Sequence, residues 1–502
     1  MTRLQSIEHF VVLMLENRSF DNLLGGLYPK SKDFGGVDGS ESNQDHSGNV
    51  WRLTETPGGD VAGLSVPNPD PGELWQDINV QIFGSGQLHE IEPYPPRDGA
   101  VADMSGFVDS YTDPRRPSRG GNAARQIMTR YKPERDVPAL ATLAREFAVC
   151  DSWFASAPCQ TWPNRFFVHT GTADGYENNN PKALFFKMPT VFDSFDRAPS
   201  KPSWAIYHHD VPQTLTLSEL IRKAQNFHMF DTFLQHAREG VLPNYSFVEP
   251  RYYADIRFFP PQFNLPNDMH PPHIVCFGDQ LVATVYNALR GNVDAWKKTM
   301  LVIVFDEHGG CYDHAPPPKA KPPSLVVSHN PNRFAFDRYG VRVPAVIASP
   351  YVQKHTILRP SDNYPEDGAT PFDHASIINT LRHRFELGDP LTARVEAAPT
   401  LERVLNLDAP VNLGPEKITA SDCKVSVFYK IKSQFERWND LQDSLHDMAR
   451  KLPTTDHDRA QKFLDRHVTR DDPHQRDGVN SGFGAIWRRA RYLALKPFGW
   501  RR

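Results

Sequence analysis

Short, wholly apolar runs separated by helix-like patterns dominate most of the chain. Their continuous apolar character, rich in Val, Ile and Leu, is typical of strands that are covered on both faces of a sheet. Apolar side chains recur at helical spacing between and after these runs, and Asp373 is a suitable N-cap for one such helix. The alternation predicts an α/β fold with a mostly parallel sheet. The predicted strands are residues 10–15, 300–305 and 343–348, and the clearest predicted helices are residues 278–290 and 373–385.

Stretches rich in proline and glycine interrupt this predicted core. Residues 28–100 are crowded with Gly, Asp, Ser and Pro, and residues 315–330 contain two runs of consecutive prolines. Loops of this length in a compact protein are usually functional lids or disordered segments. We therefore expect long loop insertions around the sheet.

Composition and charge narrow the class of protein. The 502 residues carry 56 Lys and Arg against 60 Asp and Glu, a net charge of −4, and 39% of them are hydrophobic. A charge so near balance excludes a nucleic-acid coat or a basic membrane protein, so we expect no nucleic-acid partner. The 44 prolines indicate many rigid loops.

The cysteines and the N-terminus bear on the compartment. Five scattered cysteines suggest no disulfide framework, and the absence of a Cys-x-x-Cys pair argues against a zinc site of that type. The sparse count favours a reducing compartment. The first apolar run, at residues 10–15, is too short for a signal peptide or a membrane span. We expect a cytoplasmic protein by default, with export by a leaderless route as an alternative.

The charge and the hydrophobic pattern of the chain change near residue 415. Residues 428–452 have the pattern of a charged amphipathic helix, and residues 484–502 carry six Arg or Lys and no acid. We predict a catalytic domain at 1–414 and a helical, basic-ended appendage at 415–502. Apolar and aromatic side chains share one helical face within residues 483–502, beside three arginines. This pattern suits a membrane surface, and equally a face that packs on the core.

Oxygen-donating side chains follow two of the predicted strands. Glu16 and Asn17 come after the first strand, and Asp306 and Glu307 after the second. In open α/β sheets ligands bind at the carboxyl ends of the strands. Three carboxylates brought together there cannot all stay ionised without a cation, and oxygen ligands favour Ca²⁺, Mg²⁺ or Mn²⁺. The alternative is that these residues only cap the helices that follow.

Thr161 is a candidate nucleophile. Residues 147–154 have the pattern of a strand, and they lead to Thr161 and then Pro163, a residue favoured in the first turn of a helix. A hydroxyl group at a helix N-terminus lies beside unpaired N–H groups, where a phosphoryl group can be bound and attacked. A simpler role for Thr161 is to cap the helix.

Two pairs of histidines lie close to acidic residues. His208 and His209 precede Asp210, and His270 and His273 follow Asp268. Such pairs suit contacts to an anionic oxygen or the protonation of a leaving group. Most of the 20 histidines must nevertheless be structural or surface residues.

These segments and several others resemble a phosphoesterase family that includes bacterial acid phosphatases, bacterial phospholipases C and plant non-specific phospholipases C. The matching pieces occur in the family's order across about three quarters of the chain. They are Glu16-Asn-Arg-Ser-Phe-Asp21, Thr161-Trp-Pro-Asn-Arg165, His169-Thr-Gly-Thr-Ala-Asp-Gly175, Tyr245-Ser-Phe-Val-Glu-Pro250, Asp268-Met-His-Pro271, Phe305-Asp-Glu-His-Gly-Gly310, Tyr312-Asp-His314 and Phe372-Asp-His-Ala-Ser376.

The resemblance implies a three-layer α/β/α core like that of alkaline phosphatase, one divalent metal ion and a hydroxyl nucleophile. Thr161 falls at the nucleophile position and also touches the metal. The metal ligands implied with it are Glu16, Asn17, Asp306 and Glu307. The implied phosphate-binding and acid–base residues are Asn17, His208, His209 and His270.

Two positions depart from the family pattern. Many relatives have a histidine after Asp-Pro-Gly, whereas Glu73 follows here, which leaves His89 as a candidate substitute. Ile274 stands where many relatives have an acid after His-Pro-x-His. Neither change affects the implied metal ligands.

The resemblance predicts a metal-dependent phosphoric ester hydrolase that works through a phosphothreonine intermediate. Two substrate classes stay open, namely phosphomonoesters, as for an acid phosphatase, and phosphatidylcholine-type diesters at membranes, as for a phospholipase C. A remote alternative from another class is a catalytically silent lipid-binding protein.

Overall fold

The computed structural model describes residues 2–45, 47–58, 61–90, 95–113, 123–180, 186–258, 261–324, 332–426, 439 and 441–445. The predicted amphipathic helix at 428–452 falls almost entirely outside these residues, and the basic segment at 483–502 falls wholly outside them. Both stay predictions, as does the domain boundary at residue 415. Within the described part of the chain, no helix is both long enough and apolar enough to span a membrane.

The core is an eight-stranded mixed sheet. All neighbouring strands are parallel except at β13, which runs antiparallel to both of its neighbours. The prediction of an α/β fold with a mostly parallel sheet is confirmed. In spatial order the strands are β14 (Thr356–Leu358), β6 (Ala148–Cys150), β13 (Ala345–Ala348), β12 (Thr299–Phe305), β1 (His9–Leu15), β9 (Tyr245–Val248), β7 (Trp204–His208) and β8 (Phe227–Met229).

Strands β1 and β12 lie side by side at the centre of the sheet. Their register pairs His9 with Thr299 at one end and Leu15 with Phe305 at the other. Every residue of the two strands is buried apart from the half-buried His9, as expected for strands covered on both faces. Because the two strands are parallel and end together, the residues that follow them emerge at the same point of the sheet edge.

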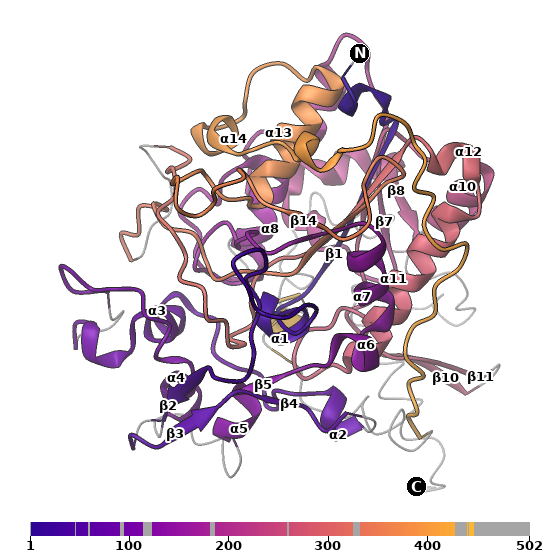
Figure 1. The fold of residues 1–502 in the computed structure, drawn as a ribbon. Helices are drawn as coiled ribbons and strands as arrows, with labels where there is room; N and C mark the ends of the chain where they lie inside the picture. The colour runs from indigo at the N-terminus through magenta and orange to yellow at the C-terminus, as the bar shows by residue number, and fades with distance from the viewer. Residues whose placement is uncertain are drawn as a thin grey trace, which may run out of the picture.

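Helices cover both faces of this sheet, which gives the predicted three layers (Figure 1). Helices α8 (Thr161–Thr170) and α13 (His374–Phe385) lie on one side, and α7 (Pro138–Glu146) and α11 (Val275–Arg290) on the other. Asp373 is the N-cap of α13, as predicted. The other helices of this part are α6 (Pro133–Asp136), α9 (Val191–Arg197), α10 (Phe230–Glu239), α12 (Val293–Trp296), α14 (Ala393–Ala397) and the 3-10 turns η1 (Leu4–Ser6), η4 (Gln213–Thr216), η5 (Ser218–Asn226) and η6 (Leu401–Val404).

The proline- and glycine-rich region that we expected to form loops, which together with the residues up to 128 we call the insertion, contains short helices and strands around a small core of its own. Ile78, Ile82, Phe107 and Tyr111 are buried in this core, and Tyr312 joins them from beside the end of β12. The region therefore packs against the carboxyl edge of the sheet. The elements of this region and of its flanks are α1 (Phe20–Leu23), β2 (Ser42–Gln44), β3 (Val50–Arg52), β4 (Thr54–Glu55), α2 (Val61–Leu64), α3 (Trp75–Phe83), η2 (Ser85–Gln87), α4 (Phe107–Thr112), α5 (Ala123–Ile127) and β5 (Thr129–Arg130). Two further strands, β10 (Asp255–Phe258) and β11 (Pro261–Asn264), form a separate antiparallel ribbon.

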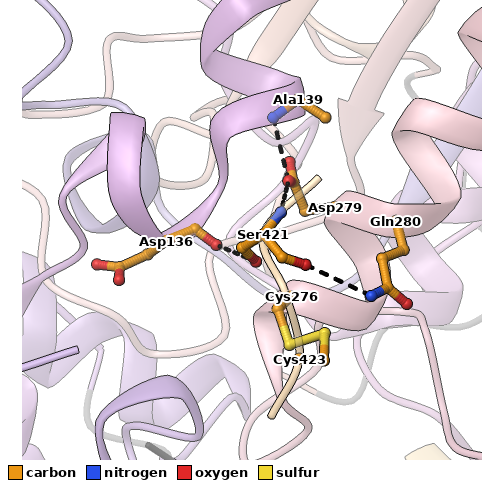
Figure 2. Close-up of a disulfide and its surroundings, with 7 residues drawn as sticks. All are labelled: Asp136, Ala139, Cys276, Asp279, Gln280, Ser421 and Cys423. Carbon is orange, nitrogen blue, oxygen red and sulfur yellow. Dashed lines mark hydrogen bonds between the residues drawn. A yellow bond between two sulfur atoms is a disulfide. The ribbon is translucent and has the colours of Figure 1, made fainter. Parts of the chain in front are cut away.

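A disulfide joins α11 to the segment 413–426, which we call the strap (Figure 2). It links Cys276 with Cys423, 147 residues later, with the Cα atoms 5.9 Å apart. Asn287 of α11 adds two hydrogen bonds of 2.9 Å to the backbone of Ile418 in the strap. The expectation of no disulfide was wrong, because cysteines so far apart give no local sequence signal. The other three cysteines are buried thiols.

Candidate active site

The ends of β1 and β12 bring Asn17, Asp306 and Glu307 together. The backbone N–H of Asn17 donates to Asp306 Oδ1 at 2.9 Å, and its side-chain amide donates to Glu307 Oε1 at 2.6 Å. Asn17 has a φ of 53°, a strained backbone conformation for a residue with a Cβ. Gly309 lies against it so closely that an added Cβ would stand 2.3 Å from the Asn17 carbonyl oxygen. The local backbone is thus built around this asparagine.

These residues are not helix caps. The short helix after β1 is capped by Ser19, whose side chain accepts from the N–H of Asn22. Asp306 Oδ1 instead accepts from two backbone N–H groups, those of Asn17 and of Glu307, and so fixes the turn after β12. The capping alternative for Glu16, Asn17 and Asp306 was therefore wrong.

Thr161 is the first residue of α8, and Gln160 is the N-cap. The Thr161 hydroxyl donates to Asn17 Oδ1 at 3.4 Å, and both side chains are fully buried. The start of α8 therefore places a hydroxyl group beside the ends of β1 and β12. This position at the first turn of the helix also lies near its positive dipole end.

Arg165, one helical turn after Thr161, is the positive charge of the site. Its guanidinium donates to Glu16 Oε1 and lies 3.7 Å from Asp306 Oδ2. Gln213 also donates to Glu16 Oε1, at 2.7 Å. Arg165 closes the motif that begins at Thr161, but the sequence alone assigned it no role. Its i+4 spacing from Thr161 was the signal that both side chains share one face of α8.

The buried carboxyl groups have strongly shifted pKa values. Burial, and then the charge of Asp306, raise the pKa of Glu16 well above its ordinary value, although Arg165 opposes this. Burial and Asp306 likewise raise the pKa of Glu307. The cause is the cost of holding several negative charges together away from water. A bound cation would reverse this cost and favour the ionised carboxylates.

The donor set fits a divalent metal ion. Within the described residues, Glu16 Oε2 and Asp306 Oδ2 are buried and have no hydrogen-bond partner. When ionised, Glu16, Asp306 and Glu307 carry three negative charges, of which Arg165 offsets one, and a divalent ion would balance the remaining two. All the charged donors are oxygens, which suits a hard cation. The structure therefore supports metal use by this chain without identifying the ion.

Glu73 is a part of the site that sequence reasoning did not assign. Its Oε1 atom accepts from the Asn17 amide at 2.6 Å and lies 3.7 Å from His270 Nε2. His89, the candidate substitute for the family histidine, is exposed on the insertion. The buried position after Asp-Pro-Gly is therefore filled by Glu73 itself.

The predicted histidines take up different positions. His270 Nε2 lies 3.7 Å from Glu73 Oε1, the atom that accepts from the Asn17 amide, and burial lowers the pKa of His270 well below its ordinary value. His208 is fully buried, and its Nδ1 lies 2.6 Å from the carbonyl oxygen of Asp210. His209 stacks on Phe230 with the ring centroids 4.1 Å apart, and burial lowers its pKa to about 3. The catalytic roles of all three histidines stay predictions.

Two further side chains hold the turn after β12. His374, at the start of α13, contacts the Asp306 carbonyl oxygen through Nε2 at 2.6 Å. His308 contacts Gln81 of α3 at 2.8 Å, which joins the turn to the insertion. Burial lowers the pKa of His308 to about 3, so the ring is neutral at ordinary pH.

A separate charged cluster includes Asp21 of α1. Asp21 pairs with Arg342 at 2.9 Å and with His314 at 2.6 Å, and Asp313 pairs with Arg342 at 3.0 Å. Arg342 thereby supplies the positive charge that these acids need. We assign this cluster a structural role.

Comparison with known proteins agrees with this geometry. The sequence model described as "Phosphoesterase family" matches residues 7–388. Non-specific phospholipase C3 of Arabidopsis thaliana is 36% identical over 84% of this chain and 78% of its own length. Non-hemolytic phospholipase C of Pseudomonas aeruginosa is 24% identical over 77% of this chain and 55% of its own. Phospholipase C A of Mycobacterium tuberculosis is 27% identical over 77% and 74%.

The family match spans the segments that carry Glu16, Asn17, Thr161, Asp306 and Glu307. The remote alternative of a catalytically silent lipid-binding protein is therefore rejected. The chain belongs to the phosphoesterase family and is a phosphoester hydrolase.

Proposed function

We propose that the chain is a metal-dependent phosphoric ester hydrolase in which the Thr161 hydroxyl is the nucleophile. The observation that carries the proposal is the contact of this hydroxyl with Asn17, 3.4 Å from Oγ1 to Oδ1, inside a fully buried group of carboxylates. The other side chains placed at this site are carboxylates, an amide and a guanidinium, whereas Thr161 offers a hydroxyl group at the start of α8. In this proposal Glu16, Asn17, Thr161, Asp306 and Glu307 hold one divalent ion.

The reaction proceeds in two displacements. The Thr161 oxygen forms a bond to phosphorus while the bond from phosphorus to the alcohol oxygen breaks, and the alcohol leaves with a proton. Water then attacks the phosphothreonine, which restores the Thr161 hydroxyl and releases the phosphate product. When bound, the metal ion supplies charge stabilisation and favours the ionised hydroxyl.

Other residues of the chain position the metal ligands and stabilise the phosphoryl group. Arg165 donates to Glu16 and favours its ionised form, and the side-chain amide of Asn17 donates to Glu307 and orients it. The positive end of α8 favours negative charge at the phosphoryl oxygens. We propose His208, His209 and His270 as phosphate contacts and proton carriers, as the family resemblance implies.

We further propose phosphodiesters of the phosphatidylcholine type as substrates. The proteins that support this choice are named phospholipases C, and one of them shares 36% identity with this chain. The basic segment at 483–502 is our proposed contact with the membrane that holds such a substrate. Phosphomonoesters, the substrates of acid phosphatases, are the competing class.

A hydrolysis panel with Thr161 variants tests both points. The panel compares p-nitrophenyl phosphate, p-nitrophenylphosphorylcholine and phosphatidylcholine liposomes at pH 5–8, after chelation and after metal add-back. We expect Thr161→Ala to lose about 10³-fold or more of the turnover, and Thr161→Ser to keep part of it. Thr284→Ala, at an exposed threonine of α11, is the matched control and should retain full activity.

The outcomes separate the alternatives. Mass spectrometry of acid-quenched wild-type enzyme should detect an adduct on a peptide that contains Thr161, a phosphoryl group with p-nitrophenyl phosphate and a phosphocholine group with the two choline diesters. Full turnover by Thr161→Ala would overturn the nucleophile. Preference for the monoester would overturn the substrate class and would leave the nucleophile in place.

A further inference from the structure

One face of helix α3 carries two buried N–H groups that have no acceptor. Trp75 and Asn79 lie one helical turn apart, so their side chains share this face. Trp75 is 4% exposed and Asn79 is fully buried. Among the described residues, Trp75 Nε1 and Asn79 Nδ2 have no hydrogen-bond partner. Burying such a group is costly, because it gives up water without gaining an acceptor.

Arg338 lies against the same face of α3. Its Nη2 donates to Asn79 Oδ1 at 2.8 Å, so the unpaired N–H groups of the Asn79 amide lie beside the guanidinium. The guanidinium also packs over Phe83, one turn further along α3, 4.8 Å from the ring centroid. The Phe334 ring lies 5.9 Å from this guanidinium and 5.9 Å from the Trp75 ring. Within the described part of the chain Arg338 Nε is buried and lacks a partner as well.

The positive charge of Arg338 has no counter-charge at contact distance. Asp337 favours the charge from the adjacent position, but its side chain is exposed and forms no ion pair with Arg338 among the residues described. The Cys159 thiol is close too, but burial raises its pKa well above the ordinary value, so it stays neutral. Burial lowers the pKa of Arg338 to about 10. Arg165 and Arg342, by contrast, are each paired with a carboxylate.

From this juxtaposition we propose that Trp75, Asn79 and Arg338 bind a phosphate-type oxyanion. The oxygens of such an anion accept hydrogen bonds from all three side chains, and guanidinium–phosphate bonds are strong because they are charge-assisted. Of the three residues Arg338 alone is partly exposed, so the anion enters from its side. Free phosphate and the phosphate group of an anionic lipid share this chemistry.

The cluster lies between two supports of the proposed metal site and shares no residue with that site. Gln81 of α3 contacts His308 in the turn after β12 at 2.8 Å. Two residues after Arg338, the N–H of Gly340 donates to the carbonyl oxygen of Ala155, in the loop before α8, at 2.9 Å. A bound anion therefore holds α3 and the segment 334–340 together beside the site. The inference goes beyond the proposed function and does not depend on it.

Phosphate binding tests the proposal without reference to turnover. The full-length protein is titrated with inorganic phosphate in a calorimeter at about pH 8, as purified and again after chelation and desalting into chloride buffer. Chelation leaves only carboxylates and Arg165 at the proposed metal site, which then repels phosphate. After chelation we expect about one phosphate per wild-type chain and about tenfold or more weaker binding by Arg338→Met. Arg222→Met, at an exposed arginine, is the matched control and should bind as the wild type does.

A second variant removes one donor and keeps the shape of the side chain. Trp75→Phe loses the indole N–H, and it serves as the test if Arg338→Met fails to fold. We expect it to bind phosphate about threefold or more weakly. Trp51→Phe is its control, because Trp51 already donates to Asp45 Oδ2 at 2.9 Å, and its phosphate affinity should equal that of the wild type.

Vesicles distinguish the two sources of the phosphate group. The chelated protein is co-sedimented with phosphatidylcholine vesicles with and without phosphatidic acid. Additional binding to phosphatidic acid that Arg338→Met loses would support the proposal with a lipid phosphate as the ligand. Loss of soluble phosphate binding alone in Arg338→Met would support it with free phosphate as the ligand.

The remaining outcomes overturn the proposal. Phosphate binding that disappears on chelation and in Thr161→Ala would belong to the metal site, which would support that site and exclude the second one. Phosphate affinity after chelation that is unchanged in both Arg338→Met and Trp75→Phe would place the anion elsewhere. No phosphate binding by the chelated wild type would also overturn the proposal.

Discussion

At the scale of single residues, Arg165 is the internal counter-ion of the site. Its side chain is almost fully buried between Glu16 and Asp306, where an unpaired charge would be costly. The motif could be read from the sequence, but the partner of Arg165 is 149 residues away. Local pattern gives no information about such a contact. The same holds for Glu73, which reaches Asn17 from 56 residues away.

Replacing Arg165 should destabilise the metal-free protein. We expect Arg165→Met to lower the free energy of unfolding by about 3–5 kcal/mol, because Glu16 and Asp306 lose their buried counter-charge. Urea unfolding after chelation measures this change. Arg222→Met removes an arginine from an exposed pair with Glu219 and should cost about 1 kcal/mol or less. Equal stability of Arg165→Met and wild type would contradict the assigned role.

The pair of His314 and Asp21 should make stability depend on pH. Burial alone would lower the pKa of His314, but the charge of Asp21 and its hydrogen bond raise it above the ordinary value. A raised histidine pKa stabilises the fold fully below the unfolded value of about 6.5 and loses this effect as the pH rises through the folded value. The contribution of His314 should therefore fade above about pH 6.5.

Variants at this position isolate that contribution. We expect His314→Gln to cost about 1–2 kcal/mol at pH 6 and less at pH 9. Thermal unfolding of wild type and variant across this range measures the difference. His89→Gln, at an exposed histidine, should show no such trend. A difference between wild type and His314→Gln that grows with pH would have the wrong sign for this pair.

At the scale of elements, much of the fold could be predicted because its strands are apolar on both faces. The prediction of residues 10–15 matches β1 to within one residue, and the oxygen donors after β1 and β12 do meet. The structure of the insertion was missed. Its helices are short and its core draws on residues spread from 37 to 128, so no local periodicity reveals them.

The strap is joined to α11 by a covalent bond. The Cys276–Cys423 disulfide closes a long loop, and Asn287 and Asp279 of α11 accept from backbone N–H groups of the strap at Ile418 and Ser421, both before Cys423. We expect Cys423→Ser to lower the free energy of unfolding by about 2–5 kcal/mol. Calorimetry under non-reducing conditions measures this change. Cys311→Ser, at a buried free thiol, is the control for the loss of a sulfur atom alone.

Treatment with a reductant provides a second check on the strap. Dithiothreitol should lower the melting temperature of the wild type and leave that of Cys423→Ser unchanged. If the reductant shifted both proteins equally, its effect would come from elsewhere in the molecule.

At the scale of the whole molecule, the site joins parts of the chain that are far apart. Residues 16–17 come from β1, Thr161 from α8, residues 306–307 from the turn after β12, and Glu73 from the insertion. The sheet fixes the relative positions of these residues, because the register of β1 and β12 brings the strand ends, and with them Asn17 and Glu307, to the same place. The sequence order of these parts gave little guide to their spatial order.

That order has a consequence for synthesis on the ribosome. Strand β1 is made first, yet its register partner β12 lies about 290 residues later. Its other neighbour, β9, lies about 235 residues after β1, so at about 5–20 residues per second β1 has no neighbouring strand to pair with for roughly 12–47 s. The nascent chain should therefore need protection from aggregation. If Glu307 holds the metal ion as we propose, the chain also cannot hydrolyse a phosphoester of the cell that makes it until residue 307 has left the ribosome.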